Sequence, residues 1–165
     1  VILLPYVGGQ HLYDQYDFDQ PWDSEDNLAI AYEIPDAYRC PIDTADYTDT
    51  SYHVVNGPGH IFEGDQAAAL RDITDGPAKT ILLVETTDSM VHWMAPDDLD
   101  IDTMSPLIND YGEYGIASNH VDGAHVATAD GLVHFVPDDL APGRLSGFFT
   151  RAGSAAVNFA DLEEE

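Results

Sequence analysis

The sequence predicts an α+β fold in which an antiparallel sheet meanders between long ordered loops. The pair Asp130-Gly131 stands between two apolar runs, which is the pattern of a tight β-hairpin. A continuous apolar run at residues 81–84 is typical of a central strand that is apolar on both faces. Thirteen glycines and ten prolines interrupt the chain at short intervals, so long helices are not expected.

The first half of the chain predicts short elements separated by prolines and turns. In order, they are a strand or helix end at 1–4, a short helix with an aromatic face within 12–27, a second short helix at 24–32, a polar loop at 41–50 and a strand at 51–55. Pro21 breaks the first helix and Pro35 stops the second, because proline cannot continue an α-helix.

The second half predicts the sheet and its connections. In order, its elements are one or two helical turns at 66–71, a turn at 72–76, a strand at 80–85, an irregular loop at 93–99, hairpin strands at 126–129 and 132–136, a short helix at 145–151 and an acidic tail at 163–165. No internal repeat or linker divides the chain. We therefore expect a single domain over residues 1–165.

The charge of the chain is extreme. It has 31 Asp and Glu against 5 Lys and Arg, a formal net charge of −26. With 44% hydrophobic residues it can still bury enough apolar surface to fold. A field this negative repels phosphate backbones and anionic lipids, so we expect no nucleic-acid partner and no peripheral membrane binding. The charge indicates a surface suited to a salty or calcium-rich exterior, or a set of cation sites.

Cys40 is the single cysteine, which excludes an internal disulfide and a thiolate zinc cluster. In a secreted chain it would pair with another segment, and in a cytosolic chain it would be a small hydrophobic residue. Both readings stay open. The chain begins at Val1 within an apolar run, so we expect a segment upstream of it.

The sequence does not predict an enzyme. It carries no G-x-S-x-G elbow, H-E-x-x-H helix, P-loop or G-x-G-x-x-G motif, and no nucleophile stands out as a partner for a His–Asp pair. His120 and His125 are close in sequence, but residues five apart face opposite sides of a strand. They could share a metal only if one of them lies in a loop.

Calcium suits the composition better, because it binds six to eight hard oxygens and tolerates irregular loops. Asp98, Asp100 and Asp102 alternate like the opening of an EF-hand loop, but Thr103 and Asn109 replace its glycine and glutamate, so that motif fails. Other clusters of candidate donors are Asp14, Asp17, Asp19 and Asp23, and Asp43, Asp46 and Asp49. The alternative for each cluster is a solvated acidic face.

A series of short motifs extends over nearly the whole chain. They are LLPYV at 3–7, LYDQYDF at 12–18, QPWDS at 20–24, YRCP at 38–41, TSY at 50–52, GPG at 57–59, DITDG at 72–76, TILLVE at 80–85 and WMAPDDL at 93–99. His120, nine further residues and Asp130-Gly131 then form an H-X9-DG signature. This ordered set resembles the DUF1559 family, a large planctomycete group of pilin-like proteins with a prepilin-type N-terminus.

The resemblance implies a pilin-like globular domain. Members of the family look like type IV pilins and type II secretion pseudopilins, with a long hydrophobic N-terminal helix followed by an exported, β-rich domain. This chain corresponds to the globular part, and a membrane contact would come only through the missing helix. Residues 121–123 read Val-Asp-Gly where the family usually has Pro-Gly-Gly. The resemblance also leaves open a disulfide from Cys40 to the N-terminal segment.

The motif residues have mainly structural interpretations. Asp130-Gly131 would form the hairpin turn, and His120 would hydrogen-bond across to that hairpin. Asp72 and Asp75 flank a turn, where they could cap Gly76 and neighbouring amides or hold a cation. Trp22 and Trp93 are expected to anchor the core. The resemblance carries over no catalytic residue.

The expected function is that of a non-enzymatic structural subunit of an extracellular or cell-surface filament or pseudopilus. Its partners would be copies of itself or other filament subunits, and calcium, the one expected cofactor, would order its loops. The alternative is an extracellular calcium-dependent binding module that shows an acidic, aromatic face to a glycan or protein. With a charge of −26, contacts between subunits must be screened, bridged by cations or made through apolar patches.

Overall fold

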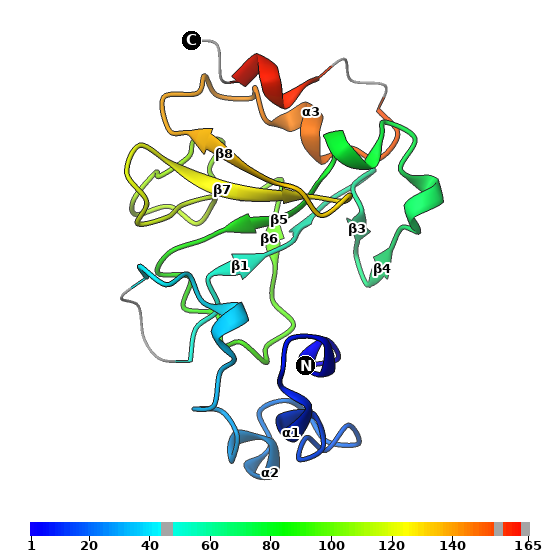
Figure 1. Cartoon of the computed structure of the whole chain (residues 1–165), viewed down its shortest axis with the longest axis vertical. Coiled ribbons are helices and arrows are strands. Elements are labelled where there is room, and N and C mark those ends of the chain that lie inside the picture. The colour runs from blue at the N-terminus through cyan, green and yellow to red at the C-terminus, as the bar shows by residue number, and fades with distance from the viewer. Residues whose placement is uncertain (44–47, 154–156, 163–165) are drawn as a thin grey trace. The chain divides into compact units, whose positions relative to one another are not determined.

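A computed structural model describes residues 1–43, 48–153 and 157–162 (Figure 1). Asp46, part of the predicted loop at 41–50, and the predicted tail at 163–165 lie outside the described residues. The chain packs as two compact units. The smaller unit comprises Val1–Tyr52 and Asp88–Asp97, and the larger comprises His53–Thr87 and Asp98–Glu165. The expectation of a single domain stays a prediction.

Two four-stranded sheets confirm the α+β fold class. The first has the order β1 (Tyr52–His53), β5 (Ile81–Glu85), β7 (Gly123–Thr128) and β8 (Val133–Pro137). The second has the order β4 (Gln66–Ala67), β3 (Phe62–Glu63), β2 (Val55–Asn56) and β6 (Leu99–Asp100). In the first sheet β7 runs antiparallel to both β5 and β8. The second is mixed, because β2 runs parallel to β3 and β6 while β3 and β4 are antiparallel.

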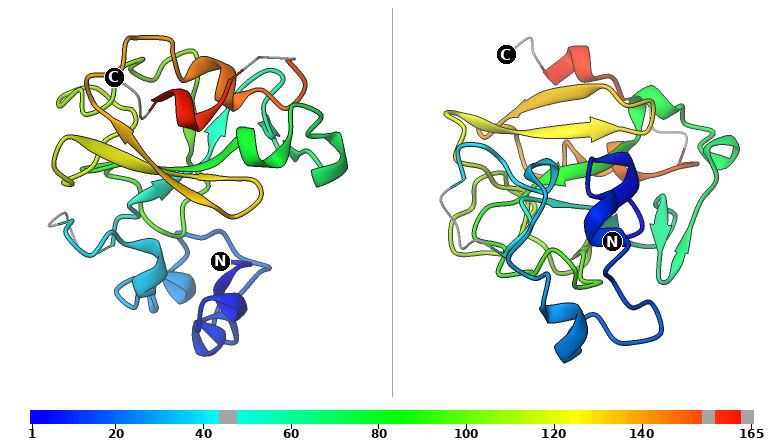
Figure 2. Two further views of the ribbon diagram at one scale, coloured as in Figure 1. Left: turned by 45° about the horizontal axis from the view of Figure 1, so that its top comes forward. Right: turned by 60° about the horizontal axis from the view of Figure 1, so that its bottom comes forward.

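The predicted hairpin is present as β7 and β8. Its register pairs Ala127 with Val133 at the tip and Gly123 with Pro137 at the base. Gly131 has a φ of 87°, a conformation that glycine adopts without steric cost. The hairpin lies beside β5, and the 3₁₀ turn η5 (Phe159–Leu162) lies next to β8 (Figure 2). The rings of His134 on β8 and Phe159 on η5 stack with 4.0 Å between their centroids.

The predicted central strand is β5, and it lies inside its sheet between β1 and β7. Ile81 and Val84 are buried in the core of the larger unit, together with Val126, Val136 and Phe148. Leu83, however, is 37% exposed. Alternation along the strand turns Leu83 to the face opposite Val84, so the apolar run is only partly buried although the strand is central.

The remaining elements are short, as the glycines and prolines predict. The helices are α1 (Gln10–Tyr13), α2 (Glu25–Leu28) and α3 (Ser146–Phe149), and the other 3₁₀ turns are η1 (Leu4–Tyr6), η2 (Asp36–Tyr38), η3 (Leu70–Asp72) and η4 (Pro77–Lys79). The Ser24 side chain caps α2 by accepting the Asn27 N–H at 3.2 Å. Among the described residues, no helix has the length and apolar character needed to span a membrane.

Three predicted boundaries differ from the structure. The start at 1–4 leads into the 3₁₀ turn η1 and is not a strand. The single strand expected at 51–55 is split into β1 and β2, which belong to different sheets. The segment 66–71 holds β4 before a single turn, η3. Each segment is short enough that its tertiary partners, more than its local pattern, decide its conformation.

The smaller unit has its own core around Trp93. This side chain is 5% exposed, and its Nε1–H donates to the Ala31 carbonyl at 2.8 Å. Trp22 is partly buried against the same cluster and stacks on the His92 ring, with 5.2 Å between the centroids. Cys40 is buried. Both tryptophans thus lie in packed surroundings and not on an open surface.

Candidate functional site

A buried carboxylate marks the candidate site in the larger unit. Glu85, the last residue of β5, is 3% exposed, and within the described residues it is the one acidic side chain among the buried positions. A charge at such a position is costly unless it is paired and hydrogen-bonded. The neighbours of Glu85 therefore explain why the chain keeps an acid there.

His125, on the adjacent strand β7, contacts Glu85 twice. Its backbone N–H donates to Glu85 Oε2 at 2.6 Å, and its ring Nδ1 lies 3.1 Å from the same oxygen. Because Leu83 pairs with Ala127 in the register, Glu85 and His125 share one face of the sheet. An ionised carboxylate only accepts hydrogen bonds, so this contact needs a proton on Nδ1.

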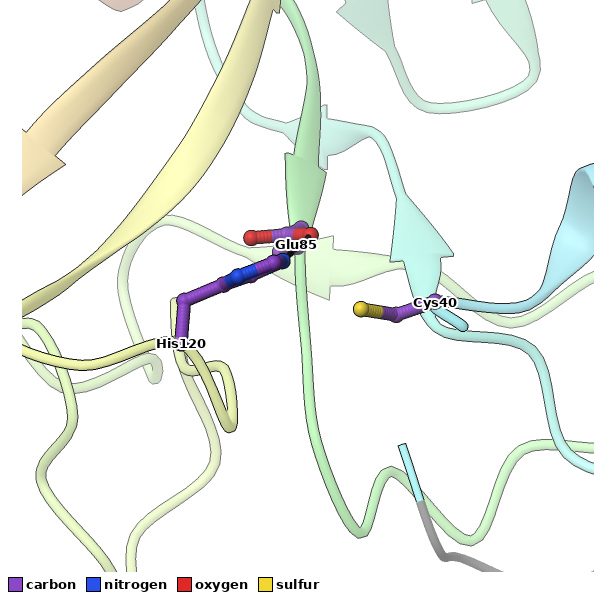
Figure 3. Close-up of side chains that lie close together, drawn as sticks. All are labelled: Cys40, Glu85 and His120. Atoms are coloured by element: carbon purple, nitrogen blue, oxygen red, sulfur yellow. Dashed lines mark ion pairs between the residues drawn. The ribbon is translucent and has the colours of Figure 1, made fainter. Parts of the chain in front are cut away.

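His120 reaches the other carboxylate oxygen from the loop before β7. Its Nε2 lies 3.4 Å from Glu85 Oε1, an ion-pair distance when the imidazole is protonated (Figure 3). The rings of His120 and His125 meet edge to face, 4.4 Å between centroids. His120 lies in a loop and His125 on a strand, which is the arrangement that the sequence requires for the two side chains to come together. We call Glu85, His120 and His125 the Glu85 network.

Ser118 and Gly123 shape the loop that presents His120. Ser118 Oγ donates to the Gly123 carbonyl at 2.8 Å and accepts the His120 N–H at 3.0 Å. A Cβ at Gly123 would lie 2.3 Å from the Val136 carbonyl oxygen, so only glycine fits at this close approach to β8. This steric restriction explains why the third residue of the Val-Asp-Gly triplet is glycine.

The contacts observed within the Glu85 network are hydrogen bonds and ion pairs between the carboxylate and the two histidines. The hydroxyl of Ser118 is bonded to a backbone carbonyl. The geometry thus suits a link that ties β5 to β7 and to the loop of His120.

The sequence predicts that His120 hydrogen-bonds to the hairpin, whereas in the structure the ion-pair partner of His120 lies on the neighbouring strand β5. The ring of His120 contacts His125, which lies on the first strand of the hairpin, while its ion-pair partner Glu85 lies on β5. Sequence reasoning missed Glu85. The available signal was a carboxylate at the end of an otherwise apolar run, where a buried strand would otherwise continue.

The other end of the hairpin is held by Asp130. Its Oδ1 accepts the Thr128 hydroxyl at 2.6 Å and the Leu132 N–H at 3.2 Å. The bond from Thr128, followed by the one from the Leu132 backbone, lowers the pKa of the Asp130 carboxyl below its ordinary value. The hairpin is therefore fixed at its base by the Glu85 network and at its tip by Asp130.

Apolar side chains are exposed just before and along β8, the second strand of this hairpin. Leu132 is 57%, Val133 65% and Phe135 41% exposed. We call these three residues the hairpin strip. In the register, Leu83 of β5 stands opposite Ala127, and Ala127 stands opposite Val133, so the strip continues across the sheet. β8 is the last strand in its sheet order, so the strip lies at a sheet edge.

The predicted calcium ligands lie in separate places. Asp72 Oδ2 accepts the Ala69 N–H at 3.2 Å, while Asp75 Oδ2 accepts the Thr150 hydroxyl at 3.0 Å and the Gly153 N–H at 2.6 Å. Amide capping is thus observed for both aspartates, though with partners other than Gly76. The carboxylate oxygens that accept these hydrogen bonds are less available to bind a cation.

The second predicted set lies around β6. Asp98, Asp100 and Asp102 are exposed, and Asp100 Oδ1 accepts the Asp102 N–H at 2.8 Å. Among the described residues, these three carboxylates do not form a group whose donor atoms lie within 4.8 Å of one another. A calcium site at these residues stays a prediction, and it would require the loop to rearrange.

Comparison with known proteins gives one match. The model of a family described as "Protein of unknown function (DUF1559)" matches residues 1–61. No curated protein and no solved structure matches the chain. The matched part includes the motifs at 3–7, 12–18, 20–24, 38–41, 50–52 and 57–59. The match supports the resemblance to the DUF1559 family over residues 1–61 of this chain.

Proposed function

We propose that this protein is a non-enzymatic structural subunit of an extracellular pilus-like filament or pseudopilus, and that it works through contacts between subunits. The observation that carries the proposal is the hairpin strip, an exposed apolar surface at a sheet edge of a chain with a net charge of −26. Apolar surface at an exposed strand edge is typical of protein–protein contact sites.

The Glu85 network supports a structural role. Glu85 is occupied by three contacts from His120 and His125, all of which join the hairpin and its preceding loop to β5. A carboxylate that is itself the general acid or base must reach the substrate, and Glu85 is 3% exposed. Here the same groups fix the position of the strand that carries the hairpin strip.

The charge of the chain supports the same role. At about 0.1 M salt the Debye length is about 10 Å, so acidic surfaces of neighbouring subunits repel each other at contact distance. Uncharged apolar surface avoids this repulsion and gains free energy on burial. A structural subunit with this composition therefore needs a surface such as the hairpin strip.

Sedimentation velocity of the protein, expressed from its complete gene, tests the proposal. We expect species that grow beyond a dimer as protein concentration rises at about physiological ionic strength. A single monomeric species at every concentration would contradict the proposal. A second experiment measures whether the protein turns over any compound in panels of hydrolase and transferase substrates. Turnover that is lost when Glu85 is substituted would favour an enzyme.

A further inference from the structure

The larger unit contains an apolar cavity of about 230 Å³. Its walls come from within the segments 101–108 and 143–149 and from Ile116, and most of the lining is aliphatic or aromatic. Among the described residues that line it, none carries a charge, although the chain as a whole has a net charge of −26. Such a lining favours a ligand with a substantial apolar part.

One wall of the cavity is a loop that backbone hydrogen bonds hold closed. The Ser105 N–H donates to the Tyr114 carbonyl at 2.9 Å, and the Asn109 N–H donates to the Ile116 carbonyl at 2.9 Å. A Cβ at Gly115 would lie 3.3 Å from Ser105 Cβ, so the two sides of the loop are in close contact. A wall that is already ordered loses little conformational entropy when a ligand binds.

The two serine hydroxyls in the lining already donate their hydrogen bonds. Ser146 Oγ donates to the Gly143 carbonyl at 2.6 Å. Ser105 Oγ donates to Asp110 Oδ2 at 2.6 Å and accepts the Leu107 N–H at 3.2 Å. A hydroxyl has one proton to donate, so neither serine offers one to a ligand. The Asp110 carboxylate, in contrast, accepts further hydrogen bonds.

The charged groups beside the lining are mainly carboxylates. Asp110 is bonded to the lining residue Ser105, and Asp100 and Asp102 stand on either side of a lining residue in the sequence. Arg144 is the one basic residue next to a lining position, and it already takes part in an interaction within the chain. Carboxylates around an apolar cavity attract cations and repel anions.

We propose that the cavity binds a small organic cation, with an apolar ring inside the cavity and an ammonium group at Asp110. A cavity of about 150 Å³ holds one benzene ring, so about 230 Å³ has room for a ring with a short substituent. Met104 and Phe149 can contact the ring through favourable sulfur–aromatic and aromatic pairs. The ammonium donates a charge-assisted hydrogen bond to the carboxylate.

This inference is independent of the proposed filament role. The cavity and the hairpin strip share no residue. The binding can therefore be measured on the complete chain at a concentration at which it does not assemble. Loss of assembly in a variant of the strip leaves the cavity unchanged.

NMR of the methionine methyl groups tests where the ligand binds. The chain has three methionines, of which Met104 lines the cavity, whereas Met90 and Met94 belong to the smaller unit. We expect benzylammonium to shift the Met104 signal saturably at low ionic strength, with a dissociation constant of about 1 mM or below. Benzyl alcohol and benzoate, which carry the same ring, should bind about tenfold more weakly or worse.

Two results of this titration would overturn the proposal. One is the lack of a saturable shift at Met104, or equal shifts at all three methionines, which indicates unspecific attraction to an acidic surface. The other is equal affinity for benzylammonium and benzyl alcohol, which shows that the carboxylates do not select a cation.

Asp110→Asn tests the charge at the cavity. Asparagine can still accept the hydrogen bond from Ser105, but we expect benzylammonium to bind about tenfold more weakly and benzyl alcohol as in the parent. A purely structural role of Asp110 would weaken both ligands equally. Asp65→Asn is the matched control, because Asp65 is exposed in the turn between β3 and β4, outside the cavity. Equal affinity of Asp110→Asn and Asp65→Asn for benzylammonium would overturn the proposal.

Leu107→Trp tests the cavity itself. Leu107 lines the cavity and is 38% exposed, so a larger side chain can fill the space from its edge without replacing a buried residue. We expect this variant to lose binding of both benzylammonium and benzyl alcohol, while Leu70→Trp, at an exposed position on η3, binds like the parent. Circular dichroism checks that each variant is folded. Parent-like binding by folded Leu107→Trp would overturn the proposed site.

Discussion

The Glu85 carboxylate accepts the His125 backbone N–H at 2.6 Å and lies 3.1 Å from the same residue's Nδ1, although 40 positions separate the two residues. His120 contacts the second carboxylate oxygen from the preceding loop. One buried acid therefore joins the central strand β5 to the hairpin and to the histidine of the H-X9-DG signature.

Glu85→Gln should destabilise the larger unit. The substitution keeps the shape of the side chain but removes the charge that two imidazoles face, and a hydrogen bond to a charged group is worth about 1.5–3 kcal/mol. We expect a fall of about that size in the free energy of unfolding, measured by urea denaturation at neutral pH. Single and double replacement of His120 and His125 by Ala then apportions the loss between them.

The matched control is Arg71→Ala. Arg71 forms an ion pair with Asp72 at 3.8 Å, and both side chains are more than half exposed. Exposed ion pairs contribute little to stability, so the free energy of unfolding of this variant should stay within about 0.5 kcal/mol of that of the parent. If Glu85→Gln changes stability no more than Arg71→Ala does, the Glu85 network does not hold the hairpin.

Burial of His60 should make the larger unit less stable in mild acid. Its side chain is 6% exposed, and this burial lowers its pKa below the ordinary value, against the opposing effects of a hydrogen bond to the Val55 backbone and the charges of Asp102 and Glu63. Below pH ~6.5 the unfolded chain therefore binds a proton that the folded chain does not, and stability falls as pH falls.

Unfolding of the parent and of His60→Gln between pH 8 and 5 checks this sign. The difference between the two free energies should be flat above pH ~6.5 and then change by at most about 1.4 kcal/mol per pH unit, levelling off once the folded protein also binds the proton. A difference that stays constant across the whole range would show that His60 does not titrate differently in the two states.

Salt should strengthen association between copies. The Debye length falls from about 30 Å at 0.01 M to about 8 Å at 0.15 M, which screens the repulsion between chains of charge −26. We expect the association constant from sedimentation equilibrium to rise over this interval. Association that weakens steadily with salt would mean that attraction between opposite charges dominates.

Calcium binding around β6 is a further proposal. A site using Asp98, Asp100 and Asp102 must first bring the three carboxylates together, so we expect weak affinity, about the 10⁻⁴–10⁻³ M typical of extracellular modules. At ten times the dissociation constant, calcium would then add about 1.4 kcal/mol of stability. Thermal melting with calcium, and with magnesium at equal ionic strength, measures this effect. Asp100→Asn should abolish it, and equal melting temperatures in the two salts would contradict the site.

The hairpin and the central strand could be predicted from sequence because local rules decide them. Gly131 supplies the positive φ that the turn needs, and a continuous apolar run such as 81–84 is typical of a strand inside a sheet. The split of 51–55 into β1 and β2 could not be predicted in this way. It depends on which strands pair on either side of Val54, and these partners come from distant parts of the chain.

The candidate site was only half predictable. His120 stands out through its spacing to Asp130-Gly131, but nothing local shows that its ion-pair partner is Glu85. That contact follows from the pairing of β5 with β7, which sets which side chains share a face. The hairpin strip was likewise hidden, because Val133 and Phe135 read as ordinary strand residues until the sheet order makes β8 the edge.

Electron microscopy of three chains, each expressed from the complete gene, tests whether the hairpin strip assembles this protein into a filament. The parent and the control variant Leu70→Asp should form helical polymers at about physiological ionic strength, whereas Leu132→Asp should remain as isolated particles. Leu70 is a suitable control because its side chain is exposed on η3, outside the hairpin strip. The claim that a fixed apolar hairpin assembles this acidic chain would be contradicted by isolated particles of the parent, or by polymers of Leu132→Asp that match those of the parent.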